Sequence, residues 1–165
     1  MKFVTKAIIL GLFSSSLMAG GTTSHSHEAT ISSVGAPGKG MPDRQVSVSM
    51  QDSMRYVFEP GLEFIKQGET IEFLIVNDGK IKHEFSIGNA EEQKKHAKMM
   101  QMMPDMDHKD PNAVSLQPGE SASLSWKFMG KETVVFACNI PGHFEAGMKR
   151  VLAIGSKHDN GLAMN

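Results

Sequence analysis

The chain has 165 residues, with 17 basic and 18 acidic side chains and a formal net charge of −1. This length is typical of a single domain with one hydrophobic core. The balance of charge, without a basic stripe, excludes a nucleic-acid-binding surface. A single cysteine, Cys138, excludes an internal disulfide, so its thiol is expected to be free, to pair between chains or to bind a metal.

Residues 1–21 have the layout of a secretory signal peptide. Lys2 and Lys6 precede the apolar run Ala7–Leu17, and the small residues 19–21 offer a cleavage site. The run is shorter than the roughly 20 residues that a membrane-spanning helix needs, which disfavours a retained anchor. We therefore expect an exported, periplasmic bacterial protein with no membrane span after cleavage. Loss of the two lysines moves the formal charge from −1 to −3.

Residues 22–43 are rich in glycine, serine and threonine and contain His25 and His27. Such a segment has too few large apolar side chains to bury, which predicts a flexible, histidine-containing tail. The folded domain is expected to span residues 44–155, followed by a C-terminal tail over residues 156–165.

From Arg44 onward the pattern is that of short strands separated by turns. Val46–Met50 alternates apolar with polar residues, as a half-buried strand does. Residues 70–76 are rich in β-branched and aromatic side chains, and the turn residues Asn77–Gly79 follow them. The predicted strands cover residues 46–50, 54–58, 62–65, 70–76, 83–87, 113–116, 121–128, 132–138 and 149–154.

Residues 89–103 interrupt this pattern with helix-forming residues. Asn89 is a suitable N-cap and Pro104 ends the predicted helix. Short strands with regular turns and one helical interruption predict an all-β protein. The expected architecture is a Greek-key β-sandwich of antiparallel strands with a short helical, methionine-rich insertion.

His83 begins one of the short strands, in which alternate residues share a face. Phe85 and Ile87 lie on the same face as His83, so the imidazole is expected to point into the protein. Glu84 is expected to point the other way, toward the surface.

Cys138, His143 and Met148 follow one another at five-residue steps after a buried strand. A hairpin-like loop of this length can direct three side chains to one point, and the inward-facing His83 can supply a fourth. Two imidazoles, one thiolate and a weak axial thioether are the ligand set of a type 1 copper site. Zinc is the competing metal, but structural zinc sites more often use several cysteines, and methionine is a poor zinc ligand.

This motif resembles the cupredoxins, the type 1 (blue) copper proteins that include plastocyanin and azurin. It is most similar to the exported cupredoxins associated with bacterial copper resistance. The resemblance covers residues 44–155 and implies a Greek-key sandwich that holds one copper ion at one end through the four residues just named. It also implies that backbone amides near the loop donate to the thiolate, with Asn139 and Ile140 as candidates.

Five of the thirteen methionines lie between Met99 and Met106. On a helix, His96, Met100 and Met103 share one face. Thioethers and an imidazole are suitable Cu(I) donors, so one interpretation is a second Cu(I) site. The other is a helix that packs its methionine face against the sandwich. The candidate ligands are His96, Met99, Met100, Met102, Met103, Met106 and His108.

Two functions fit these features. The first is a copper-tolerance protein that binds copper ions and sequesters or oxidises them, for which the methionine-rich insertion is the motive. The second is a soluble one-electron carrier between respiratory partners, with an apolar docking surface formed around His143 by Pro141, Phe144 and Ala146. Either function predicts a redox or copper-transfer protein partner.

An enzymatic function is not expected. Multicopper oxidases and copper nitrite reductases place histidine directly beside the copper cysteine, whereas Ala137 and Asn139 flank Cys138 here. The sequence contains no recognisable substrate-turnover site, so the redox chemistry to consider is a step on bound Cu(I).

Overall fold

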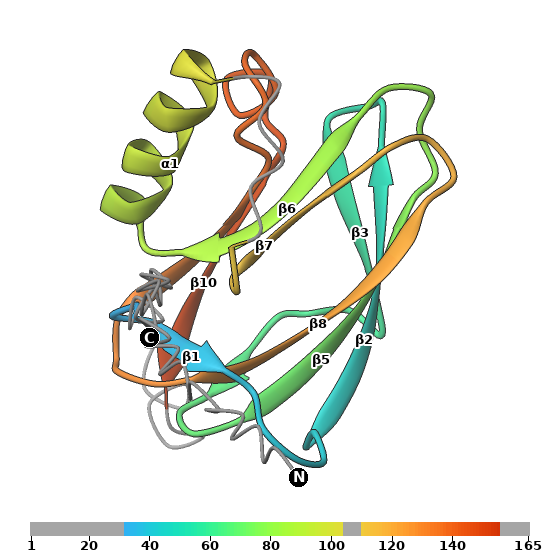
Figure 1. Cartoon of the computed structure of the whole chain (residues 1–165). Helices are drawn as coiled ribbons and strands as arrows, with labels where there is room; N and C mark the ends of the chain where they lie inside the picture. The colour runs from blue at the N-terminus through green and yellow to red at the C-terminus, as the bar shows by residue number, and fades with distance from the viewer. Residues whose placement is uncertain (1–31, 104–109, 156–165) are drawn as a thin grey trace, which may run out of the picture.

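The structure, a computed structural model, describes residues 32–103 and 110–155. In these residues ten strands form two five-stranded sheets that pack face to face, and one helix lies outside them (Figure 1). The sheet orders are β1-β8-β5-β2-β3 and β4-β10-β9-β6-β7. The elements are β1 (Gly35–Pro37), β2 (Arg44–Gln51), β3 (Arg55–Glu59), β4 (Ile65–Lys66), β5 (Thr70–Asn77), β6 (His83–Gly88), α1 (Ala90–Met102), β7 (Ala113–Leu116), β8 (Ser121–Phe128), β9 (Thr133–Ala137) and β10 (Lys149–Gly155).

The predicted β-sandwich is confirmed, but its strands are not all antiparallel. β2 pairs in parallel with β5, and β10 pairs in parallel with β4. The strand predicted over residues 62–65 is reduced to β4, two residues long. Alternation of apolar and polar residues determines which side chains face inward, but it carries no information on the direction of the neighbouring strand.

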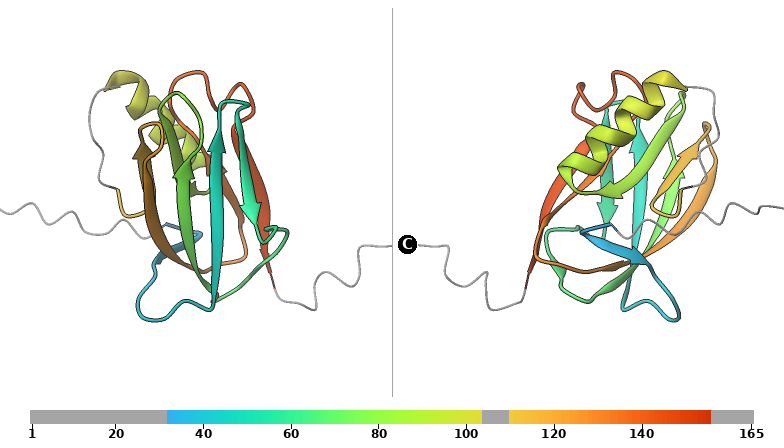
Figure 2. Two further views of the ribbon diagram at one scale, coloured as in Figure 1. Left: turned by 90° about the vertical axis from the view of Figure 1, so that its right-hand side faces the viewer. Right: turned by 60° about the vertical axis from the view of Figure 1, so that its left-hand side comes forward.

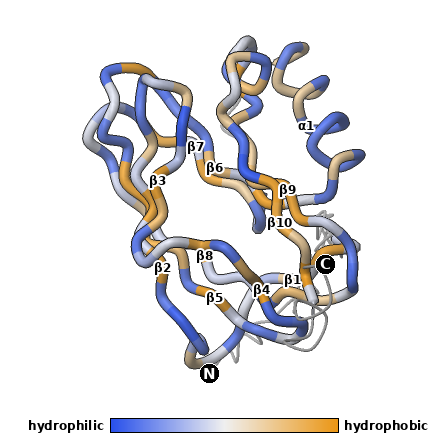
Figure 3. Tube along the Cα trace, turned by 180° about the vertical axis from the view of Figure 1, so that it is seen from behind, coloured by the Kyte–Doolittle hydropathy of each residue, from blue (hydrophilic) through white to orange (hydrophobic). Residues whose placement is uncertain are grey.

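The core forms where the apolar faces of the two sheets meet. Along β2, Val46, Val48 and Met50 are buried while the residues between them face solvent. An aromatic cluster fills the interior, in which Phe85 and Phe136 stack with their ring centroids 5.4 Å apart. Figure 3 shows this distribution, with hydrophobic residues concentrated in the strands and hydrophilic residues along α1 and the turns.

The predicted start of the folded domain at Arg44 is too late. Strand β1 lies within the segment expected to be a tail and pairs antiparallel with β8, and Val34 is fully buried. Gly35 has a φ of +148°, and a Cβ atom there would lie 2.2 Å from the Lys127 carbonyl oxygen. Backbone pairing needs few apolar side chains, so composition alone did not reveal this strand. The predicted signal peptide 1–21, residues 22–31 and the C-terminal tail 156–165 lie outside the described residues.

Helix α1 begins and continues as its sequence predicts. Asn89 caps it in a capping box with Glu92, in which each side chain accepts a hydrogen bond from the other residue's backbone N–H. The helix packs on β6 and β9 through buried Gln93 and Met100. Figure 2 shows it lying across the outer side of this sheet, at the same end as the loop between β9 and β10. Within the described residues, no helix has the length and apolar character needed to cross a membrane.

Candidate metal centre

Three neighbouring strands bring the predicted copper ligands together at one end of the sandwich. His83 is the first residue of β6, Cys138 directly follows β9 and Met148 directly precedes β10. β9 pairs antiparallel with both β6 and β10. The Cys138 N–H donates to the Met148 carbonyl oxygen at 3.1 Å, which closes the loop that carries His143. Strand pairing therefore positions Cys138 and Met148 beside His83, which precedes Cys138 by 55 positions in the chain.

The side chains of His83, Cys138 and His143 converge as the sequence predicted. Their ligand atoms all lie within 4.8 Å of one another. The Cys138 Sγ atom is 3.3 Å from His143 Nδ1, and the two imidazole centroids are 5.0 Å apart. His83, Cys138 and Met148 are fully buried, while His143 is half-buried and forms the side of the site that faces solvent.

His83 supplies the observation that favours a metal. Its Nε2 atom lies 3.1 Å from a carboxylate oxygen of Asp52, which orients the ring. Its Nδ1 atom is buried and has no hydrogen-bond partner in the structure. Buried polar atoms are rarely left unpartnered, whereas an imidazole oriented by a carboxylate on one nitrogen commonly binds a metal through the other. The donor set therefore fits a single metal ion.

The thiol of Cys138 is protonated in the metal-free protein. Burial raises its pKa to about 12, although the backbone N–H groups of Glu84 and Ile140 act in the opposite direction. The Glu84 N–H donates to Sγ at 3.3 Å. Ile140 was a predicted donor, but Asn139, the other candidate, donates its N–H to the Glu84 carboxylate instead. A metal that binds here must displace the thiol proton, so binding releases H⁺.

The imidazole of His143 is poised to bind as a neutral ligand. Burial, together with the neighbouring His83, lowers its pKa below the ordinary value, against a smaller opposite effect of Asp52. Neutral imidazole is the form that coordinates metal ions.

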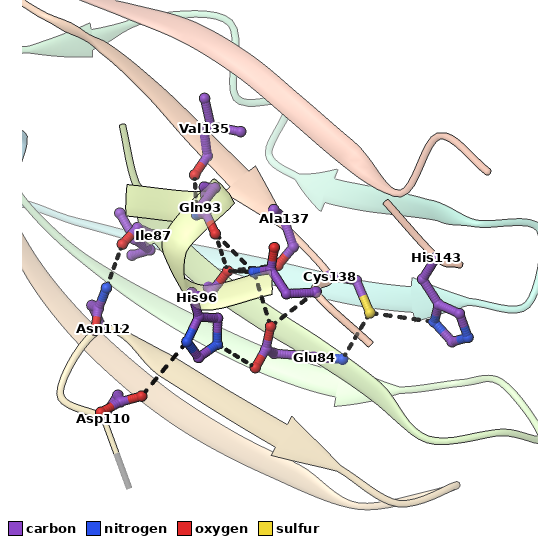
Figure 4. Close-up of polar contacts among 12 residues, drawn as sticks. Glu84, Ile87, Gln93, His96, Asp110, Asn112, Val135, Ala137, Cys138 and His143 are labelled. Atoms are coloured by element: carbon purple, nitrogen blue, oxygen red, sulfur yellow. Dashed lines mark hydrogen bonds and ion pairs between the residues drawn. The ribbon is translucent and has the colours of Figure 1, made fainter. Parts of the chain in front are cut away.

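The prediction that Glu84 faces solvent is wrong. Its side chain points away from the copper ligands, but α1 covers it, and only 1% of its surface is exposed. Its carboxylate accepts hydrogen bonds from the backbone and side chain of Asn139, and lies 2.8 Å from His96 Nε2 (Figure 4). Ser86 and Gln93 complete this buried polar network. Alternation places a side chain on a face but does not say what covers that face.

The sequence did not reveal that two acidic residues, Asp52 and Glu84, support the ligands. Asp52 lies in the turn between β2 and β3, and Gly79 allows its approach to His83, because a Cβ atom at position 79 would lie 2.1 Å from the Asp52 carboxylate. The sequence predicts the turn at Asn77–Gly79, but nothing in the local sequence connects Asp52 with a histidine 31 positions later. For Glu84, the sequence did not reveal that its backbone N–H donates to Cys138 and that its carboxylate accepts from Asn139.

The structure places the residues of the predicted methionine-rich site in different environments. His96 contacts Glu84, and Met100 is buried with 2% of its surface exposed. Met99 lines a pocket beside His96. Met102 and Met103 lie on the surface, with 65% and 37% exposed. Met106 and His108 lie outside the described residues. A shared Cu(I) site for the whole set remains a prediction.

The arrangement suits one-electron chemistry. A type 1 copper ion bound by this donor set would exchange single electrons, since thiolate and thioether favour Cu(I) while imidazole accommodates both oxidation states. Cys138 and Met148 are held away from water, and the half-buried His143 is the ligand closest to solvent. The protein therefore contributes a buried thiolate and two imidazoles, of which that of His143 is accessible from solvent.

Comparison with known proteins places the chain among copper proteins. No protein-family model matches it. It is 44% identical over 125 residues to the copper-resistant cuproprotein CopI of Rubrivivax gelatinosus, with 75% of this chain and 74% of that protein covered. It is 41% identical over 125 residues to the protein of the same name from Vibrio cholerae, with 75% and 73% covered.

Solved structures show the same fold at low sequence identity. Auracyanin B superposes with a TM-score of 0.56 at 20% identity, covering 73% of this chain and 96% of that one. An azurin from Methylomonas sp. strain J gives a TM-score of 0.51 at 18% identity, covering 70% and 99%. These confirm the cupredoxin fold that the ligand motif predicted. Taken with the two cuproproteins, they show that this chain belongs to the CopI family of copper-resistant cuproproteins, with a cupredoxin fold and a type 1 copper site.

Proposed function

We propose that the chain is exported to the periplasm and binds copper at the type 1 centre. By sequestering or oxidising this copper, it protects the cell. The observation that carries this proposal is the convergence of Cys138, His83 and His143 within 4.8 Å, with a buried His83 Nδ1 that has no protein partner. The names of the two relatives add copper resistance to copper binding. The signal-like residues 1–21 support export.

The alternative function is a soluble one-electron carrier. The half-buried imidazole of His143 favours it, because Pro141 and Ala146 are exposed and Phe144 is half-buried in the same loop as this ligand. A redox partner that docked there would approach the copper through His143. The same surface could receive a copper-transfer partner in a tolerance function, so the surface does not separate the two.

We also propose that the chain has no separate substrate-turnover site. Ala137 and Asn139 support this proposal, because neither residue beside Cys138 is the histidine that multicopper oxidases and copper nitrite reductases place there. A redox step on bound copper is then the chemistry that the proposal assigns.

A complementation experiment tests the function. A strain that lacks the gene should grow poorly in added copper, and the wild-type chain should restore growth, whereas Cys138→Ser should not. The purified wild type should also show a strong sulfur-to-copper visible band that the variant lacks. Met41→Leu, which changes a surface methionine 92% exposed and outside the site, is the matched control and should behave as wild type.

Two outcomes would contradict the tolerance function. One is normal growth of the deletion strain in copper together with a respiratory defect in its absence, which would establish the electron carrier instead. The other is full rescue by Cys138→Ser. Export is tested separately by fractionation and mass: the periplasmic protein should lack about the first 21 residues.

A further inference from the structure

A pocket lies between α1 and the segment that enters β7. It has a volume of about 310 Å³, and its lining includes His96 and Met99 from α1 and Asp110 from the facing segment. The side chains of His96 and Asp110 are 14% and 40% exposed, so an ion from solvent can reach them. None of these residues belongs to the type 1 centre.

The His96 ring is held in a fixed orientation from behind. Its Nε2 atom lies 2.8 Å from Oε1 of the buried Glu84, while Nδ1 lies on the side of Asp110 (Figure 4). Metal-binding histidines characteristically have one ring nitrogen on a carboxylate, which sets the ring orientation and strengthens the other nitrogen as a ligand. His83 and Asp52 show the same arrangement at the type 1 centre.

The opposite wall of the pocket carries a carboxylate at a separation suited to a shared ion. The His96 Nδ1 atom is 3.8 Å from Asp110 Oδ2, which is too long for a hydrogen bond. Two metal–ligand bonds of about 2.0–2.2 Å each span a distance of this size. Met99 lies three residues after His96 on the same side of α1 and lines the same pocket.

The charges around the pocket also favour a cation. Glu92 and Asp110 line it, and Glu84 lies behind His96. Lys95 contributes the opposing charge, but its ammonium group is 2.9 Å from Glu91, a carboxylate on the exposed face of the helix.

We propose that this pocket binds a second copper ion through His96 Nδ1, the Asp110 carboxylate and the Met99 thioether. The inference rests on the proposed function in copper tolerance and names where the additional copper is held. Copper is the metal because an imidazole and a carboxylate bind Cu²⁺ more tightly than they bind the other divalent first-row ions, and because the thioether donor also suits an ion that arrives as Cu(I).

The second site is connected to the first through one residue. Glu84 contacts His96 with its carboxylate and donates its backbone N–H to Cys138 Sγ at 3.3 Å. A metal ion at His96 withdraws charge from the imidazole and so changes the field that Glu84 exerts at the thiolate. Occupancy of the pocket therefore shifts the sulfur-to-copper absorption band of the type 1 centre.

The experiment uses the full protein with its type 1 copper already in place and oxidised. One further equivalent of Cu(II) is added, loosely held metal is removed by gel filtration, and retained copper is counted by atomic absorption and electron paramagnetic resonance. Wild type should retain a second copper with a nitrogen-coupled spectrum distinct from the type 1 signal. Asp110→Ala should weaken its retention at least about tenfold, as expected for a lost metal-site interaction. Met99→Leu should weaken retention by a similar factor when the experiment is repeated anaerobically with Cu(I), the oxidation state that a thioether favours. Glu63→Ala, which removes an exposed carboxylate that does not line the pocket, is the matched control and should retain the second copper.

A second arm adds Zn(II), which has no spectrum of its own, to the same proteins. It should shift the type 1 band in wild type and in Glu63→Ala but not in Asp110→Ala. Equal copper retention in wild type and Asp110→Ala, or no retained copper in wild type, would overturn the second site. Copper held by the N-terminal histidines is common to all variants and cancels in the comparison. Absence of the type 1 band from wild type would instead overturn the proposed function, so the two failures are distinguishable.

Discussion

At the scale of single residues, the copper site depends on a carboxylate that binds no copper. Asp52 accepts hydrogen bonds from the Lys80 backbone N–H at 2.9 and 3.0 Å and lies 3.1 Å from His83 Nε2. These contacts, with the effect of His83, hold the pKa of Asp52 below its ordinary value. The carboxylate is therefore ionised at neutral pH and can orient His83 so that Nδ1 faces the metal.

We expect Asp52→Asn and Gly79→Ala each to weaken copper binding by about 10–100-fold, the usual effect of losing a partner of a metal-binding histidine. The first removes the negative charge, and the second places a methyl group where the Asp52 carboxylate lies. Competition with a copper chelator measures the affinity. Ser53→Ala, in the same turn, is the control and should leave the affinity unchanged. Affinities equal to wild type in both variants would show that Asp52 does not support the ligand.

At the scale of elements, α1 is joined to the sheet by an ion pair as well as by packing. Burial alone would lower the pKa of His96, but its hydrogen bond to Glu84 and the charges of Glu84 and Asp110 raise it above the ordinary value. Glu92 and Lys95, with opposite charges, are the other titratable groups that line the adjoining pocket. In the metal-free protein, protonated His96 therefore stabilises the contact between helix and sheet.

The sign of this effect sets its pH dependence. Because the pKa of His96 is higher in the folded than in the unfolded protein, its stabilisation is fully present below about pH 6.5, the unfolded-state value, and is lost as pH rises through the folded-state value. We expect His96→Gln to lower the free energy of unfolding by about 1–3 kcal/mol near pH 6 and by less as pH increases. Denaturant unfolding of the metal-free proteins between about pH 5 and 9 measures this difference. The exposed Lys98→Gln is the control; a constant difference for His96→Gln across this range would contradict the pairing.

At the scale of the whole molecule, the sandwich includes a strand that composition assigned to a tail. Val34 is fully buried, and β1 covers the edge of β8. We expect a chain that begins at residue 39 to be less stable than one that begins at residue 22, by at least about 2 kcal/mol, the contribution of one buried valine. Thermal unfolding of both chains measures the difference. A chain that begins at residue 32 keeps β1 and should match the longer one, whereas equal stability of all three would show that β1 contributes nothing.

The sequence by itself determined most of the strands, the capped helix and the ligand motif. These depend on local periodicity, on Asn89 beside Glu92, and on the spacing of Cys138, His143 and Met148, all of which act over a few residues. His83 was also found locally, because alternation placed it on the same face as buried aromatic and aliphatic neighbours.

Only the tertiary structure decided which side chains support those ligands. Asp52 meets His83 across 31 positions of the chain, and His96 covers Glu84 because α1 folds back over β6. The parallel pairing of β2 with β5 and the addition of β1 to β8 are likewise set by contacts between distant segments. Such contacts form when whole sheets and helices pack, and no local pattern of residues encodes which distant partner will cover a given face.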